Sequence, residues 1–388
     1  MSAGRHDLAS SDSKGWPNRA WLPIVGAALL GVVGGGLFVR LVLWPDQGEV
    51  PPGEARNPDL PRGVYVALGD SYSAGEGLPP WQPGTEDVPE GDRCHRSASH
   101  GFPLLIWWEG MEDRRFRACA GADVRNVFDE IQRHGDGKDN SLENYLGLQV
   151  EPGVLTDDVK LITVTVGGND VGFAKVLKFC ALLLPPWDSC LDKKFDPYKE
   201  FDADPTLEEW IEDRFTELGN ALEVMYARLN GEAPDDARII VLGYPSLFPE
   251  KVQLTCLGEF GAFNKTERRR YIEYGIALNE LIRDRAQGAG LEYLDTLWLF
   301  SNHEPCGAGG SDWMRFPSPR VIDGWFHPNE IGQEKLARVI LCYLYEHPGG
   351  AGEAEVPVQE TAAVDAATRE CFESSDSFPA PPIEATRS

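Results

Sequence analysis

Basic residues are scarce in this chain: 36 Lys and Arg are set against 62 Asp and Glu, and the formal net charge is −26 at pH 7. Proteins that bind nucleic acids need Lys and Arg to neutralise the phosphates, so this balance argues against nucleic acid as a partner. It would also repel a strongly anionic substrate unless basic groups lie close to the site.

Metal-binding patterns are missing as well. The chain has eight cysteines, but no Cys-x-x-Cys and no Cys/His cluster with the spacing of a zinc site. We therefore expect neither a metal nor a cofactor. The cysteines fall in local pairs along the chain, and disulfides would indicate an oxidising, extracytoplasmic setting. The sequence alone leaves the connectivity open.

One long uncharged run lies near the start of the chain. The twenty residues Ala20 to Val39 carry no charge, which is enough to span a bilayer, and Arg40 is followed by another apolar stretch to Trp44. Basic residues precede the run and acidic ones follow it, so residues 1–19 are expected in the cytoplasm and the bulk of the chain outside. The prediction is a single-pass transmembrane anchor at 20–44 in the cell membrane. The alternative is a cleaved signal peptide and a secreted protein, although the run is long and no clear Ala-x-Ala site follows.

The rest of the chain divides by composition. Residues 45–62 are rich in Pro and Gly and predict a stalk, residues 63–347 alternate between strand and helix patterns, and residues 348–388 have the composition of a disordered tail. Buried strands are expected at 64–68, 161–166, 237–242 and 291–294, and helices at 206–229, 265–286 and 329–345. This alternation predicts an α/β fold, a flavodoxin-like three-layer α/β/α sandwich with a mainly parallel central sheet, preceded by one transmembrane helix.

Candidate catalytic side chains follow the ends of two of these strands and precede the last helix. The apolar strand at 64–68 stops at Gly69-Asp70-Ser71, which places Ser71 at the carboxyl edge of the sheet, where open α/β folds hold their sites. Ser71 is a candidate nucleophile; the plain alternative is a serine that caps a helix. The strand at 161–166 runs into Gly167-Gly-Asn-Asp170, and His327 is followed by Pro-Asn and the last helix.

Together with Cys119-Ala-Gly-Ala122, these stretches resemble the four blocks of the SGNH (GDSL-type) hydrolases, in the order of that family and over roughly residues 64–344. The chain is similar in particular to secreted actinobacterial esterases and lipases. The resemblance implies a serine hydrolase of carboxylic esters, with a lipid or a small acyl ester as substrate. It makes Ser71 the nucleophile and His327 the general base. The backbone N–H groups of Ser71 and Gly121 and the side-chain amide of Asn169 would form the oxyanion hole.

The same resemblance implies three disulfides in sequential pairs. They are Cys94–Cys119, Cys180–Cys190 and Cys256–Cys306. The two remaining cysteines, Cys342 and Cys371, are expected to form a fourth pair.

The histidine block departs from the family pattern, in which an Asp three residues before the histidine orients the imidazole. Here Gly324 holds that position and Asp323 lies one residue earlier. Either Asp323 still reaches His327, or a main-chain carbonyl near Gly324 accepts the ring proton, as in some actinobacterial relatives that work with a Ser–His dyad. We favour the dyad.

Three other functions are compatible with parts of the sequence. The chain could be an O-acetyl esterase of cell-wall or other glycans, which would differ only in its loops. A flavodoxin-like phosphate-binding module would use the glycines after Gly69, and a non-catalytic surface module would bind lipid or glycan. The phosphate-binding and non-catalytic hypotheses leave Asn169 and His327 without a role, so we favour the membrane-anchored ester hydrolase.

Overall fold

In the computed structural model, the described residues form a central sheet of five strands, all parallel, in the order β2-β1-β3-β4-β5. The strands are β1 (Gly63–Gly69), β2 (Met111–Phe116), β3 (Val159–Thr165), β4 (Arg238–Leu242) and β5 (Glu292–Leu294). The prediction of a parallel sheet is thereby confirmed.

The structure describes residues 57–86, 92–129, 148–183, 189–197, 205–250, 263–307, 309, 311–315, 324–349 and 366–374.

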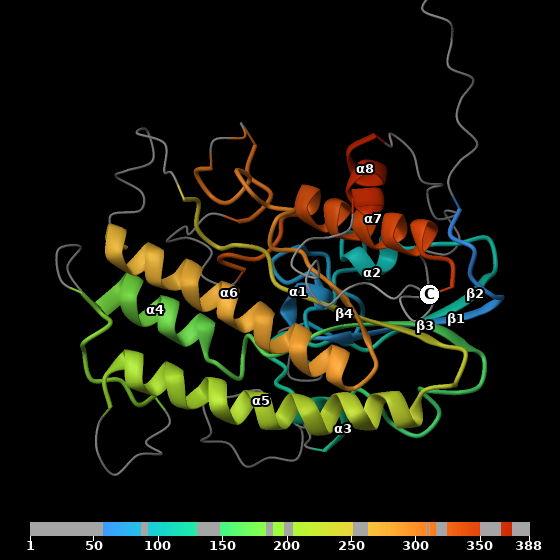
Figure 1. Ribbon diagram of the computed structural model, residues 1–388, viewed down its shortest axis with the longest axis horizontal. Helices are drawn as coiled ribbons and strands as arrows, with labels where there is room; N and C mark the ends of the chain where they lie inside the picture. Colours follow the sequence, from blue (N-terminus) through green and yellow to red (C-terminus); the bar gives the residue numbers. More distant parts are fainter. Residues whose placement is uncertain are drawn as a thin grey trace, which may run out of the picture. The chain divides into compact units, whose positions relative to one another are not determined.

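Helices cover both faces of this sheet (Figure 1). They are α1 (Ser71–Ala74), α2 (Phe102–Leu105), α3 (Arg125–Phe128), α4 (Phe173–Leu183), α5 (Leu207–Glu232), α6 (Lys265–Gly288), α7 (Glu330–Glu346) and α8 (Ala366–Ser374). Helices α3, α5 and α6 pack on one face, and α2 and α7 pack on the other. The layers agree with the α/β/α arrangement expected from the sequence.

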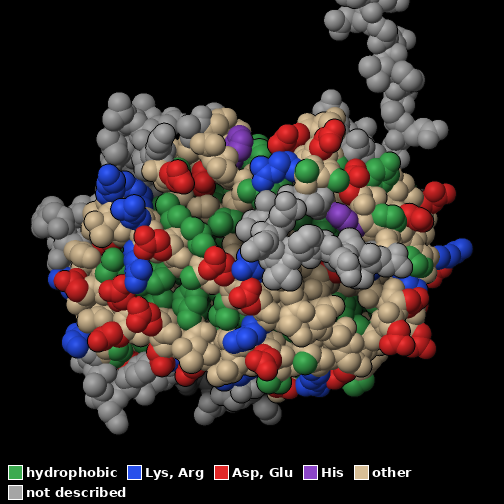
Figure 2. Space-filling model, viewed as in Figure 1, with side chains coloured by type: hydrophobic (Ala, Val, Ile, Leu, Met, Phe, Trp, Pro, Cys, Tyr) green, Lys and Arg blue, Asp and Glu red, His purple; other side chains and the backbone are tan. Residues whose placement is uncertain are grey.

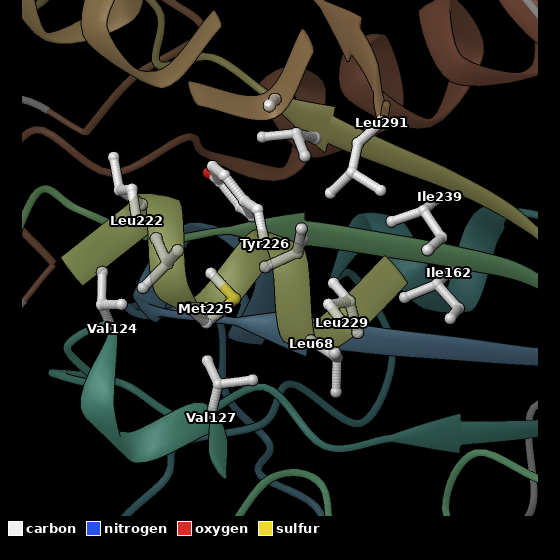
Figure 3. Close-up of a cluster of buried hydrophobic side chains, with 14 of the residues drawn as sticks. Leu68, Val124, Val127, Ile162, Leu222, Met225, Tyr226, Leu229, Ile239 and Leu291 are labelled. Carbon is white, nitrogen blue, oxygen red and sulfur yellow. The ribbon is translucent and has the colours of Figure 1, made fainter. Parts of the chain in front are cut away.

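The apolar run of β1 is buried on both sides because neighbouring side chains of a strand point to opposite faces. Val64, Val66 and Leu68 belong to the cluster under α5, whereas Tyr65 and Ala67 belong to the cluster under α7. Figure 3 shows the first cluster, in which side chains of α5 meet those of three strands. The residues of α5 in this contact recur at helical spacing: Leu222, Met225, Tyr226 and Leu229.

The two longest helices begin where the sequence signals a start. The Thr206 side chain accepts a hydrogen bond from the backbone N–H of Glu209, and the Glu209 side chain accepts one from the Thr206 N–H. Thr followed three positions later by Glu is the sequence pattern of such a reciprocal capping box, and the helix expected to begin at 206 does so. Asn264 and Glu267 form the same box at the start of α6.

The C-terminal region differs in one stretch from the expected disorder. Residues 366–374 form helix α8, and a disulfide of Cys371 with Cys342 links it to α7. Phe372 packs against the cluster under α7. The composition of a segment reports only its own apolar content, so it does not reveal a helix that is stabilised by a covalent link and a docking surface elsewhere.

The N-terminal predictions fall on residues that the structure does not describe. The predicted cytoplasmic segment 1–19, the membrane segment 20–44 and most of the stalk 45–62 lie outside the described residues. Within the described ranges, none of the helices is both long and apolar enough to cross a membrane.

Candidate active site

Two predicted site residues lie at the carboxyl edge of the sheet: Ser71 is two residues beyond β1 and Asn169 four residues beyond β3. Tyr244, which was not predicted, lies two residues beyond β4 at the same edge. Strand β1 is flanked by β2 on one side and β3 on the other, so the chain reverses its direction of winding there. Open α/β sheets form their crevice at such a switch point.

Ser71 and His327, 256 positions apart, are hydrogen-bonded: His327 Nε2 lies 2.7 Å from Ser71 Oγ. The other ring nitrogen, Nδ1, lies 2.9 Å from the carbonyl oxygen of Trp325. A carbonyl can only accept, so Nδ1 carries the proton and Nε2 is left to accept from the serine hydroxyl. Burial lowers the pKa of His327, which favours the neutral ring. A neutral imidazole in this position can take up the serine proton.

The backbone around His327 is held from several sides. The Arg315 N–H donates to the His327 carbonyl at 2.8 Å, and the Tyr72 hydroxyl donates to the Phe326 carbonyl at 2.6 Å. Asn329 caps α7 and donates its side-chain amide to the Asp312 carbonyl at 2.7 Å. Phe326 has a φ of 58°, a left-handed conformation that a non-glycine residue adopts only when its surroundings enforce it.

The loops after β2 and β3 are tied together next to Ser71. The Asn169 side-chain amide donates to the Ala122 carbonyl at 2.9 Å, and the Asp170 carboxylate accepts from the Val124 N–H at 3.2 Å. Burial and the nearby Asp123 raise the pKa of Asp170 to about 7. These bonds fix the loop that contains Gly121, which has a φ of 78°.

Three possible oxyanion donors lie on Ser71 and on these two loops. Among the described residues, none accepts a hydrogen bond from the backbone N–H of Ser71 or of Gly121. An Asn side-chain amide has two N–H groups. One of those of Asn169 donates to the Ala122 carbonyl, and the second can donate to an oxyanion. Ser71, Asn169 and His327 line one pocket, and Gly121 belongs to the adjoining loop without lining it.

A buried polar network beneath Ser71 was not expected from the sequence. Asp70, which is 1% exposed, accepts hydrogen bonds from the Tyr72 N–H at 3.0 Å, from the Thr165 hydroxyl at 2.9 Å and from the Tyr244 hydroxyl. The Tyr244 oxygen in turn accepts from the Gly168 N–H at 3.0 Å, beside Asn169. Burial raises the pKa of Asp70 to about 6, and the three donors oppose that rise. The network links the ends of β1, β3 and β4.

A family model described as "GDSL-like Lipase/Acylhydrolase family" matches residues 67–335 of the chain. The chain belongs to this family. It is 28% identical over 269 residues to Lipase 1 of Streptomyces coelicolor, covering 69% of this chain and 82% of that one. It is 29% identical over 277 residues to a lipase of Streptomyces rimosus, covering 70% and 82% of the two chains. The chain is therefore a lipase or esterase, a hydrolase of carboxylic esters.

Among solved structures, this GDSL-like hydrolase is similar to phospholipase A1 from Streptomyces albidoflavus, with 27% identity, a TM-score of 0.49 and coverage of 70% of this chain and 94% of the other. It is also similar to an extracellular lipase from Streptomyces rimosus, with 23% identity, a TM-score of 0.49 and the same coverage.

Three disulfides of the hydrolase join described cysteines. They are Cys94–Cys119, Cys180–Cys190 and Cys342–Cys371. Cys306 is also disulfide-bonded, and its expected partner, Cys256, lies outside the described residues. Asp323 lies outside them too. Within the described part of the chain, no group of three or more His, Cys, Asp or Glu side chains could hold a metal ion.

Proposed function

We propose that this GDSL-like hydrolase cleaves carboxylic esters outside the cytoplasm by Ser–His catalysis, with Ser71 as nucleophile and His327 as general base. The observation that supports the proposal most is the 2.7 Å contact between Ser71 Oγ and His327 Nε2, with Nδ1 of the ring bonded to the Trp325 carbonyl. No carboxylate is needed to orient the ring in this arrangement, because the carbonyl fixes both its tautomer and its direction.

The reaction follows in two halves. Ser71 Oγ attacks the ester carbonyl carbon as its proton passes to His327 Nε2, and the carbonyl oxygen becomes an oxyanion. The C–O bond to the alcohol then breaks, and the leaving alkoxide takes the proton from His327. Water attacks the acyl-enzyme with His327 again as base, the acid leaves and Ser71 regains its proton.

The oxyanion would be stabilised by the backbone N–H groups of Ser71 and Gly121 and by the Asn169 amide. Removal of one such donor typically costs about 10²–10³ in turnover. Glycine at position 121 suits this role because its φ of 78° is available to it at little cost and it lets the backbone approach the substrate.

The decisive experiment is hydrolysis of p-nitrophenyl esters, from acetate to palmitate, by the purified full-length chain and by Ser71→Ala. The alanine variant should lose at least about a thousandfold in kcat. The chain offers a matched control in a second Ser–His pair, since Oγ of the exposed Ser99 lies 2.8 Å from Nδ1 of its half-buried neighbour His100. Ser99→Ala should keep the wild-type rate. Equal rates for wild type and Ser71→Ala would refute the proposed nucleophile.

The extracytoplasmic location is supported by the disulfides of the hydrolase, which persist in oxidising compartments. We place residues 20–44 as a membrane anchor on the strength of their sequence alone. Fractionation of cells that express the full chain tests this: an anchored protein sediments with membranes and is released by detergent, whereas a cleaved signal peptide would leave it in the medium.

A further inference from the structure

The pocket beside Ser71 and His327 has apolar walls contributed by two helices. From α4 and α6 come Phe173, Ala174, Leu177, Tyr271, Ile272 and Gly275. Asp70, buried beneath the catalytic pair, is the one Asp, Glu, Lys or Arg among the described residues that line it. A cavity of this character binds hydrocarbon, because there is almost no charge to solvate a polar group.

The pocket extends away from the catalytic pair between α4 and α6, which run side by side in Figure 1. Phe173 follows closely after Asn169, and Leu177 lies about one helical turn, or about 5.4 Å, farther along α4. Figure 2 shows hydrophobic side chains gathered on the surface over the region of these helices. Ile276, which is 39% exposed, follows Gly275 directly and adds apolar surface there.

Gly275 is an unusual wall residue, because it lies in the middle of α6 and none of the described residues packs so closely that a glycine is required. A Cβ built on it would meet no atom of the described part of the chain within 4 Å, whereas one on Gly219 of α5 would press on Leu281 and Arg285 at 3.3–3.4 Å. A glycine inside a helix costs about 1 kcal/mol relative to alanine. The other helical glycines with open space around them, Gly231 and Gly288, lie exposed at helix ends, where glycine costs little.

A side chain at position 275 would reach into the pocket. Residues 271 and 272 lie on the same face of α6 as residue 275, since they precede it by four and three positions. Helical side chains lean toward the N-terminal end of their helix, so a side chain on residue 275 would cover Tyr271 and Ile272, which are themselves pocket walls. The absence of a side chain therefore keeps this stretch of the wall open.

We propose that the channel between α4 and α6 binds the acyl chain of a long, unbranched acyl ester, and that Gly275 determines the acyl length the enzyme accepts. This inference rests on the function proposed above and specifies its substrate class. The ester carbonyl is placed at Ser71, and the hydrocarbon passes Phe173 and then crosses Gly275.

The test compares kcat/KM for p-nitrophenyl palmitate with that for the acetate, in the full-length chain. In Gly275→Leu the palmitate-to-acetate ratio should fall about tenfold or more, since a few misplaced methylenes in an apolar pocket cost at least that much. Gly275→Ala should lower the ratio less. Gly288→Leu is the matched control on the same helix, outside the pocket and also in open space, and should keep the wild-type ratio.

The possible results distinguish a failure of the proposed ester hydrolysis from a failure of the role proposed for Gly275. A wild-type chain that hydrolyses neither ester contradicts the proposed function itself. A wild type that is active on esters, with Gly275→Leu folded and its ratio unchanged, overturns the role of Gly275. If Gly275→Leu fails to fold, Gly275→Ala tests the inference instead. Alanine has a higher helix propensity than glycine, and its methyl group enters the channel. An unchanged palmitate-to-acetate ratio in Gly275→Ala would also overturn the inference.

Discussion

The Tyr72 hydroxyl donates a 2.6 Å hydrogen bond to the carbonyl oxygen of Phe326, which joins the residue after the proposed nucleophile to the residue before the proposed general base. The tyrosine ring also packs against the imidazole of His327, with the ring centroids 5.1 Å apart. Since Phe326 has a positive φ, this bond helps to hold a backbone conformation that directs His327 toward Ser71. We therefore propose that Tyr72 positions His327.

Tyr72→Phe should therefore lower kcat on a short ester about tenfold with little change in KM, because a small displacement of a catalytic group is costly. The unfolding free energy should fall by about 0.5–1.5 kcal/mol for the lost hydrogen bond. Tyr65→Phe is the control: its hydroxyl makes a buried 2.7 Å bond to Thr163, so it should lose similar stability and keep kcat. Equal losses of kcat in the two variants would make Tyr72 a merely structural residue.

Asn169→Ala should reduce kcat by about 10²–10³ while KM changes little, if its free amide proton meets the oxyanion only in the transition state. The same change also removes the bond to the Ala122 carbonyl, so the fold must be checked by its thermal midpoint. Asp170→Ala supplies the comparison, because it removes the acceptor that ties the same two loops through Val124, and Asp170 does not line the pocket. A loss in kcat that is as large for Asp170→Ala as for Asn169→Ala would indicate loop disruption instead of a lost oxyanion donor.

Asp323→Asn should leave turnover within about tenfold of wild type. The Nδ1 proton of His327 is already accepted by the Trp325 carbonyl at 2.9 Å, so an aspartate has no ring proton left to orient. An orienting aspartate would instead be worth about 10⁴ in kcat. Steady-state kinetics on one soluble ester distinguish a loss of kcat within about tenfold from a loss of about 10⁴. A loss near 10⁴ would refute the dyad.

The strands and long helices could be predicted because their signals are local. The uncharged run before Gly69 and the Thr206–Glu209 capping box each occupy a few consecutive residues, and both elements form where expected. The order of the strands has no such local signal. Helix α8 was also missed, since its stability comes from Cys342, 29 positions away.

At the site, Ser71 and His327 stand in recognisable blocks, and the main-chain acceptor expected near Gly324 is present as the Trp325 carbonyl. The sequence could not identify which carbonyl it would be, because every residue has one. The choice depends on the backbone conformation, which has positive φ values at Gly324 and Phe326. Tyr244 meets Asp70 across two strand ends, a contact that depends on the sheet order.

The pH dependence of kcat/KM should show an acid limb with an apparent pKa below 6.5, the ordinary value for histidine, because burial lowers the pKa of His327. His327 must be neutral to accept the serine proton, so activity falls as the pH drops through that value. Two charges act on the ring in opposite senses: Glu76 raises its pKa, and Arg315 lowers it. Glu76 is buried and is bonded to His95 and to the Gly77 N–H.

Removing each charge should move the acid limb in opposite directions. Glu76→Gln removes a negative charge that favours the imidazolium, so the limb should move to lower pH; Arg315→Gln removes a positive charge that opposes it, so the limb should move to higher pH. Both are measured as full pH profiles of kcat/KM on p-nitrophenyl butyrate, within the pH range in which each variant stays folded. A purely structural effect of either substitution would lower the rate at every pH without moving the limb. Limbs that shift in the same direction, or that stay at the wild-type position, would show that the limb does not report the titration of His327.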